Sequence, residues 1–294
     1  MSLRLEMLQV ARLSPNLLGD SSALVSRFAR SQHLPDGGFA DRSGASDLYY
    51  TVFGLDCLLA LREDLPNAES RAYLERFGGG AGLDFVHLAC LARCWAAVSG
   101  GNFGRVPRED ILRRIEGYRS RDGGYGRSPG AETGSVYAAF LALGAYEDFG
   151  VSQPEQGRLL GSLKSLRSAD GAYADQPGAA RGLTTNTAAA VMLLRHLGEA
   201  PGGELADWLL DRAHPQGGFF ALADAPIPDL LSTATALHAL TAMQTPLDGV
   251  REPCLDFIDS LWTNRGGFYG SWADDGLDCE YTYYALLSLG HLSL

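Results

Sequence analysis

The sequence predicts an all-α protein in which six helical hairpins close into a double ring around a central cavity. The first indication is a short phrase that recurs along the 294 residues: a turn residue, a glycine pair (once Gly-Ala) and an aromatic residue. From Tyr125 onward the aromatic residue returns every 46 to 49 residues, and a fixed period of this length is typical of repeat architectures. The phrase occupies residues 36–39, 122–125, 170–173, 216–219 and 265–268, with a degraded copy at 100–103.

Each phrase is followed by a loop and then by an apolar stretch of helical length. The stretch from Thr187 to Leu194 has almost no polar face, and a helix that is apolar all round is one buried on all sides. Small residues recur along these stretches and allow close packing of helices. The predicted inner helices are residues 47–61, 83–98, 135–146, 185–197, 230–243 and 278–292.

Charged, amphipathic stretches alternate with the apolar ones and predict an outer layer of helices. Proline and acidic residues at 107–110 and 153–155 form a helix-start signature. Six inner helices that are apolar on every side favour closure of the ring, because an open solenoid would expose both of its ends. The predicted outer helices are residues 21–31, 68–76, 108–119, 155–167, 203–213 and 253–261.

The composition of the chain limits the classes of partner and the cellular compartment to be expected. The continuous repeat favours one toroidal domain over residues 1–294. A net charge of −11 argues against nucleic acid or an anionic membrane surface as the main partner. No apolar run reaches the roughly 18 residues of a membrane span, and the first residues do not open a signal peptide. Five scattered cysteines without a CxxC pair indicate neither a disulfide framework nor a zinc finger, so we expect a cytoplasmic protein.

One segment resembles a known family. Residues 123–132 read Gly-Gly-Tyr-Gly-Arg-Ser-Pro-Gly-Ala-Glu and are followed by Val-Tyr-Ala-Ala at 136–139. This stretch is similar to one in the prenyltransferase and squalene-cyclase repeat superfamily, and most similar to the β subunits of protein farnesyl- and geranylgeranyltransferases. The resemblance covers roughly residues 20–294 and implies a closed α6–α6 toroid, an isoprenoid substrate and a helical α-type partner subunit.

The resemblance also implies a catalytic zinc ion. Family members hold it with an Asp-x-Cys-Tyr motif on the fifth inner helix and a histidine on the sixth. Here Asp229 matches the family aspartate, but Leu231 stands where the cysteine is expected. Asp278 falls in register with the histidine and is followed by Cys279. We therefore expect Asp229, Asp278 and Cys279 as zinc ligands in a prenyltransferase that transfers a prenyl group from a diphosphate to an acceptor such as a cysteine thiol.

Candidate substrate-binding residues come from loops and inner helices. The family places a basic cluster before the fifth inner helix, but residues 222–228 contain no basic side chain. Arg127 and Arg181, before the third and fourth inner helices, are the candidates for binding a diphosphate. Aromatic side chains suit a prenyl chain or a carbocation. The aromatic residues expected to line the cavity are Tyr49, Tyr50, Tyr137, Phe140, Tyr281 and Tyr284.

Two other functions stay open. Asp278-Cys279 also resembles the Asp-Cys pair of oxidosqualene cyclases, which implies a small terpene cyclase with Asp278 as the general acid. A toroid that binds a lipid or a protein partner without catalysis is the third hypothesis. Asp229 and Asp278 are equally well explained as helix N-caps, since a carboxylate there satisfies free backbone N–H groups.

Overall fold

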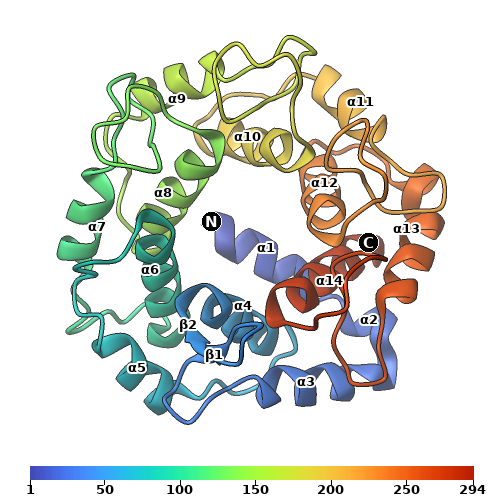
Figure 1. Ribbon diagram of the computed structural model, residues 1–294, viewed down its shortest axis with the longest axis horizontal. Helices are drawn as coiled ribbons and strands as arrows, with labels where there is room; N and C mark the ends of the chain where they lie inside the picture. The colour runs from blue at the N-terminus through green and yellow to red at the C-terminus, as the bar shows by residue number, and fades with distance from the viewer.

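Six helices run side by side around the centre of the computed structural model, which describes residues 1–294 (Figure 1). Each inner helix contacts the next, and the sixth packs against the first and closes the ring. The predicted α6–α6 toroid is thereby confirmed. The inner helices are α4 (Leu48–Ala60), α6 (Phe85–Ser99), α8 (Val136–Asp148), α10 (Thr184–His196), α12 (Leu230–Ala242) and α14 (Cys279–Leu292).

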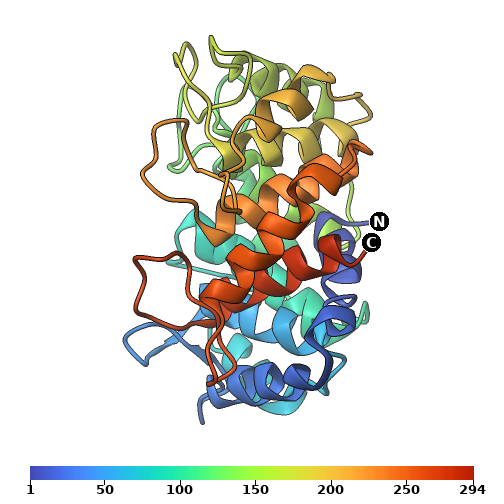
Figure 2. The same cartoon turned by 90° about the vertical axis from the view of Figure 1, so that its right-hand side faces the viewer.

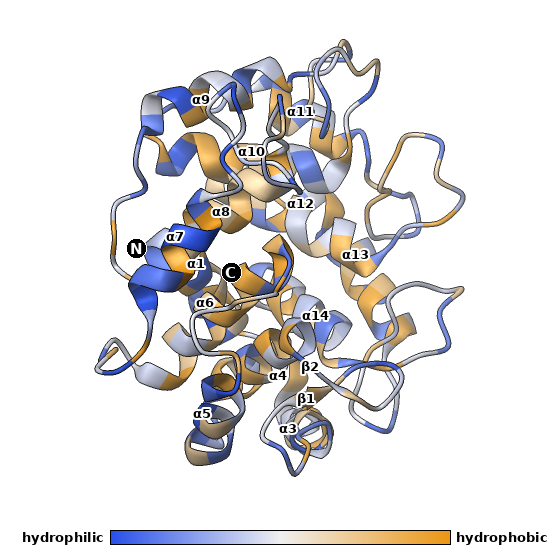
Figure 3. Cartoon of the chain, turned by 60° about the vertical axis from the view of Figure 1, so that its left-hand side comes forward, coloured by the Kyte–Doolittle hydropathy of each residue, from blue (hydrophilic) through white to orange (hydrophobic).

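A second ring of helices, most of them shorter, surrounds the first and gives the molecule its amphipathic outer layer (Figure 3). In the third of them, Ile111 and Ile115 are fully buried, while Arg113 and Arg114 between them are exposed. The last outer helix begins before the predicted residue 253, with Pro253 inside it. The outer helices are α3 (Ser22–Ser31), α5 (Asn67–Glu75), α7 (Arg108–Glu116), α9 (Gln156–Ser165), α11 (Glu204–Leu210) and α13 (Asp248–Leu261).

The recurring aromatic residues plug the junctions between hairpins. All five are buried, and most are anchored by the inner helix that follows: the N–H of Phe219, for example, donates to Thr233 Oγ1 at 2.9 Å. The first turn forms a small antiparallel pair, β1 (Phe39–Ala40) with β2 (Ser46–Asp47). Gly217 has φ +97°, and a side chain there would overlap the backbone carbonyl of Pro253, so glycine is required.

All inner helices begin at one end of the ring, where the long loops lie, while both chain termini lie at the other end (Figure 2). Acidic side chains cap several of these starts: Asp47, Asp84, Asp229 and Asp278 accept hydrogen bonds from first-turn backbone N–H groups. The end of the ring that carries the loops is called the mouth. The capping interpretation of Asp229 and Asp278 agrees with this geometry.

An N-terminal helix that the repeat pattern did not predict, α1 (Leu3–Ala11), crosses the centre of the ring at the end opposite the mouth (Figure 1). It packs against α4, α8 and α14 and forms the floor of the interior. A short helix, α2 (Pro15–Leu18), and a 3₁₀ turn, Gly19–Ser21, lead from it to the outer ring. No helix in the structure has both the length and the apolar character needed to cross a membrane.

Candidate functional site

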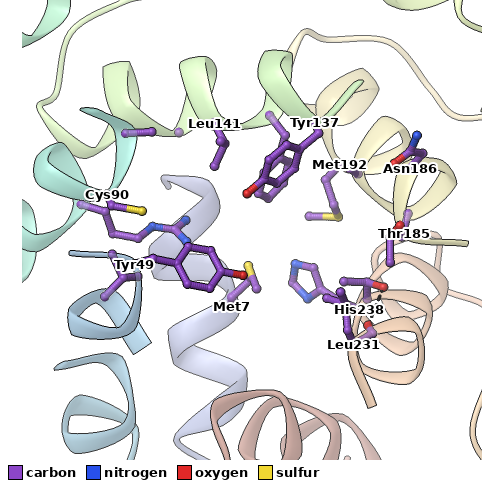
Figure 4. Close-up of a pocket in the computed structure, with 18 of the residues that line it drawn as sticks. Met7, Tyr49, Cys90, Tyr137, Leu141, Thr185, Asn186, Met192, Leu231 and His238 are labelled. Carbon is purple, nitrogen blue, oxygen red and sulfur yellow. Dashed lines mark hydrogen bonds between the residues drawn. The ribbon is translucent and has the colours of Figure 1, made fainter. Parts of the chain in front are cut away.

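The inner ring encloses a cavity of about 420 Å³, within the range of small-molecule sites. All six inner helices contribute to its wall, and Met7 of α1 contributes from the floor. Most of the lining residues are apolar or aromatic. Figure 4 shows the labelled Tyr49 and Tyr137 on different helices, both directed into the open space.

Four of the six aromatic residues predicted from the sequence line this cavity: Tyr49, Tyr137, Phe140 and Tyr284. Phe53 joins them, with its ring centroid 5.0 Å from that of Tyr49 and 5.4 Å from that of Tyr284. These rings present faces and edges to the space where a ligand would lie. An apolar chain or a carbocation is the kind of ligand that such a wall stabilises.

Tyr50 and Tyr281 do not line the cavity, which corrects the prediction for both. Successive residues of a helix point about 100° apart, so Tyr50 turns away when Tyr49 faces inward, and its ring lies edge-on to that of Tyr49. Tyr281 packs over Gly270 at the mouth, with the Arg42 guanidinium 5.3 Å from its ring centroid.

The two predicted diphosphate-binding arginines are both paired with acids. Arg127 lies on the cavity wall and contacts Asp175 at 3.1 Å, and Asp175 lines the cavity too. Arg181 lies outside the cavity, where it contacts the exposed Asp224 at 2.9 Å. Binding a diphosphate at either arginine would require it to displace a carboxylate.

Asp278, the predicted general acid, is buried at the start of α14 and held in an ion pair. Its Oδ1 accepts from the N–H of Tyr281 at 2.9 Å, and its Oδ2 accepts from Arg42 Nε at 2.7 Å. Burial raises the pKa of Asp278, whereas these two donors lower it. Asp278 is not among the residues that line the cavity, and neither is Glu280, two residues further along α14.

Glu280, which the sequence analysis did not single out, has the properties expected of a general acid. Its Oε1 accepts a hydrogen bond of 2.6 Å from the hydroxyl of Tyr49 on the cavity wall. Glu280 precedes Tyr284 by four residues and therefore lies above it on the same face of α14. Burial raises the pKa of Glu280 to about 7, and the charge of Asp278 adds to the effect.

The three predicted zinc ligands do not form a metal-binding group. Both carboxylate oxygens of Asp229 accept from Ser232, at 2.7 Å each. Cys279 is fully buried, and burial raises the pKa of its thiol, which disfavours the thiolate that zinc requires. No three His, Cys, Asp or Glu side chains lie together as metal ligands. The donor set therefore does not fit the zinc site that the family resemblance implies.

A cluster of buried charges lies near the floor of the cavity, where α1 meets the ring. Asp148 contacts Arg4 at 3.4 Å and Arg93 at 3.6 Å, and Arg4 also contacts Asp56 at 3.5 Å. Burial raises the pKa of both aspartates, and the arginines oppose the shift. Two cations and two carboxyl groups balance one another, and Arg93 and Asp148 reach the cavity surface.

His238 of α12 also lines the cavity. Its Nδ1 lies 3.0 Å from Nε2 of His291 on α14, and both rings are almost fully buried. Burial lowers the pKa of His238 to about 4 and also lowers the pKa of His291 well below its usual value. Both imidazoles are therefore neutral near pH 7.

The sequence matches the model of the prenyltransferase alpha-alpha toroid domain over residues 5–76, 85–195 and 186–293. The chain belongs to this family. No curated protein sequence matches the chain.

Solved structures with different activities share the toroid. The protein geranylgeranyltransferase-I of Candida albicans, complexed with GGPP, has a TM-score of 0.69 at 14% identity, over 91% of this chain and 90% of that one. The type II terpene cyclase MstE from Scytonema, complexed with geranylgeranyl dihydroxybenzoate, has a TM-score of 0.64 at 14% identity, over 95% and 97%. The GH76A alpha-1,6-mannanase from Salegentibacter reaches 0.62 at 13% identity, over 94% and 98%. Identities this low establish the fold alone.

Proposed function

We propose that this protein binds an isoprenoid chain in the toroid cavity and cyclises it, with Glu280 as the general acid. In this reaction the carboxylic acid of Glu280 donates its proton to a carbon–carbon double bond. The electron pair of that bond forms the new C–H bond and leaves a carbocation, which neighbouring double bonds attack to close rings. The observation that carries the proposal is the contact between Glu280 and Tyr49, a cavity-lining residue.

The protonation state of Glu280 supports this role. A general acid works best when its pKa lies near the operating pH, and Glu280 has a pKa of about 7. Asp278 is less suited, because Arg42 holds it in an ion pair. Its negative charge instead raises the pKa of Glu280, so we assign Asp278 a positioning role.

The aromatic wall supports the later steps. A carbocation that moves along the cavity is stabilised by the π faces of Phe53, Tyr137 and Tyr284. An apolar cavity also excludes the water that would otherwise trap the cation. A cavity of about 420 Å³ accommodates a folded chain of several isoprene units.

Prenyl transfer is the second candidate, and one observation favours it. Arg93 and Arg127 both line the cavity, and guanidinium groups are suited to bind a diphosphate. Against it stand the carboxylates that pair with both arginines and the poor fit of Asp229, Asp278 and Cys279 to zinc. A thiol acceptor and a helical partner subunit would belong to this second proposal. Ligand binding without turnover is the outcome if neither reaction occurs.

The test is incubation with geranylgeranyl diphosphate and with geranylgeranyl dihydroxybenzoate, followed by product identification by mass spectrometry and NMR. We expect a cyclic isomer with unchanged mass from at least one of them. Glu280→Gln is expected to reduce its formation by about 10²–10⁴-fold. Glu252→Gln, an exposed acid on α13, serves as the matched control and leaves the rate unchanged. Release of diphosphate without an isomer would favour prenyl transfer, and unaltered substrates would contradict both reactions.

A further inference from the structure

The deep wall of the cavity carries a polar group that the proposed protonation step does not use. His238 is 6% exposed, and its ring points into the cavity (Figure 4). Its Nε2 has no hydrogen-bond partner in the protein. Leaving a buried polar atom without a hydrogen-bond partner is unfavourable, so the place of His238 on the wall of a ligand-sized cavity points to a role toward the ligand.

The partner of His238 determines what Nε2 presents to the cavity. Only one of the two nitrogens in the contact with His291 carries the shared proton, because both rings are neutral. When His238 Nδ1–H donates to His291 Nε2, the Nε2 of His238 is left with a free lone pair. His291 Nδ1 then carries the second proton and also has no partner.

His238 and Glu280 lie at different depths of the toroid, as expected of a residue that donates the first proton and one that removes the last. Glu280 is the second residue of α14, and Leu231 is the second residue of the neighbouring α12. His238 lies seven residues beyond Leu231, or about 10 Å further along the helix axis at 1.5 Å per residue. An acid near the mouth and a neutral base on the deep wall are thus separated along the length of the cavity.

We propose that His238 is the base that ends the cyclisation. This inference rests on the proposed function, because it needs the carbocation that Glu280 generates. His238 Nε2 takes a proton from the carbon next to the last cationic centre; the C–H electron pair becomes the new double bond, and the imidazole becomes an imidazolium. One proton enters from Glu280 and one leaves to His238, so the product is an isomer of the substrate.

The pairing with His291 assists this step and its reversal. Once His238 is protonated, its Nδ1 proton can move to His291 Nε2, so the charge is shared by the two rings. The carboxylate of Glu6 favours the charged form of both rings, whereas the positive charges of Arg195 and His196 disfavour it at His238. Burial lowers the pKa of the imidazolium, so it returns its proton to water when the product leaves.

The test compares the products of wild-type protein and His238→Gln on the two geranylgeranyl probes. We expect substrate consumption to continue, because protonation by Glu280 precedes the step. The wild-type alkene is expected to fall about tenfold or more, replaced by an alcohol from capture of the cation by water or by alkene isomers. His214→Gln, the same substitution at a histidine outside the cavity, is the matched control and retains the wild-type product.

The outcomes separate the two proposals. An unchanged product from folded His238→Gln, beside a cyclising wild type, would overturn the base while leaving Glu280 as the acid. A wild type that forms no ring would overturn both.

¹⁵N NMR of histidine-labelled wild-type protein needs no variant. A neutral His238 at neutral pH supports its role as the base, and an imidazolium there would overturn that role. His291→Gln, which cannot relay the proton, is expected to retain binding and to alter the pH dependence of the product ratio.

Discussion

The hydroxyl of Tyr49 and the carboxyl group of Glu280 lie 2.6 Å apart, although 231 residues separate them in the chain. They come from α4 and α14, the two inner helices whose contact closes the ring. Closure of the toroid therefore builds the candidate acid, and neither residue has this environment in an open array of hairpins.

Cyclisation should depend on pH through Glu280. Its pKa is raised to about 7, and only the protonated form can donate, so the rate should fall as the pH rises through that value. Tyr49→Phe removes a donor that lowers this pKa, and should move the descending limb of the rate profile upward by about one pH unit. Tyr50→Phe is the control and should leave the limb in place. A limb that stays fixed in Tyr49→Phe would contradict the assignment.

Arg42 should contribute measurably to stability. Arg42→Gln leaves the buried carboxylate of Asp278 without its cation, and should lower the free energy of unfolding by about 1–3 kcal/mol at neutral pH. Arg76→Gln breaks the exposed contact with Asp36 and should cost at most about 1 kcal/mol. Urea unfolding monitored by circular dichroism measures both. Equal values for the two variants would show that Asp278 does not depend on its partner.

Docking of α1 should weaken at alkaline pH. His196 bonds to Glu147 at 2.7 Å and to Glu6 of α1 at 2.9 Å, and these carboxylates raise its pKa from 6.5 to about 9. Because the folded value is raised, the stabilisation is complete below pH 6.5 and is lost as the pH rises through 9. The hydrogen bond from His196 lowers the pKa of Glu6 from 4.5 to about 2, so that contribution persists above pH 4.5 and is lost only as the pH falls through 2.

Hydrogen exchange, corrected for intrinsic rates, measures this docking. Protection of residues 3–11 should fall between pH 6.5 and 9, whereas α7 should keep its protection. His196→Gln should remove the pH step. A step of the same size in the variant would assign it to another group.

The anchored turns should be sensitive to single hydroxyl groups. Thr233→Val removes the acceptor of the Phe219 N–H and should cost about 1–2 kcal/mol. The buried hydroxyl of Thr241, on the same helix, has no partner, so Thr241→Val should be neutral or slightly stabilising. Thermal unfolding of the two variants tests this difference, and an equal loss in both would indicate a general intolerance of valine in α12.

The fold could be predicted because its signals are local. Each repeat carries its own Gly-Gly-aromatic turn and its own apolar helix, so the period alone revealed the ring. The N-terminal helix α1 has no repeat partner and was not predicted. Its place on the cavity floor depends on long-range contacts such as that between Arg4 and Asp148.

The site was predictable only in its general character. Aromatic residues on inner helices were expected to line a cavity, but the rotation of each helix decides which do, and Tyr50 and Tyr281 face elsewhere. Glu280 was missed because its raised pKa comes from burial and from the charge of Asp278. His238 was missed for a similar reason, since its significance comes from His291 and from an Nε2 atom without a partner.

The most direct test of the central claim is incubation of wild-type protein with the two geranylgeranyl probes in D₂O. Proton donation by Glu280 predicts a cyclic product with one deuterium on the carbon that receives the first proton, and none of this product from Glu280→Gln. A cyclic product without deuterium, or release of diphosphate in place of ring formation, would contradict cyclisation initiated by protonation.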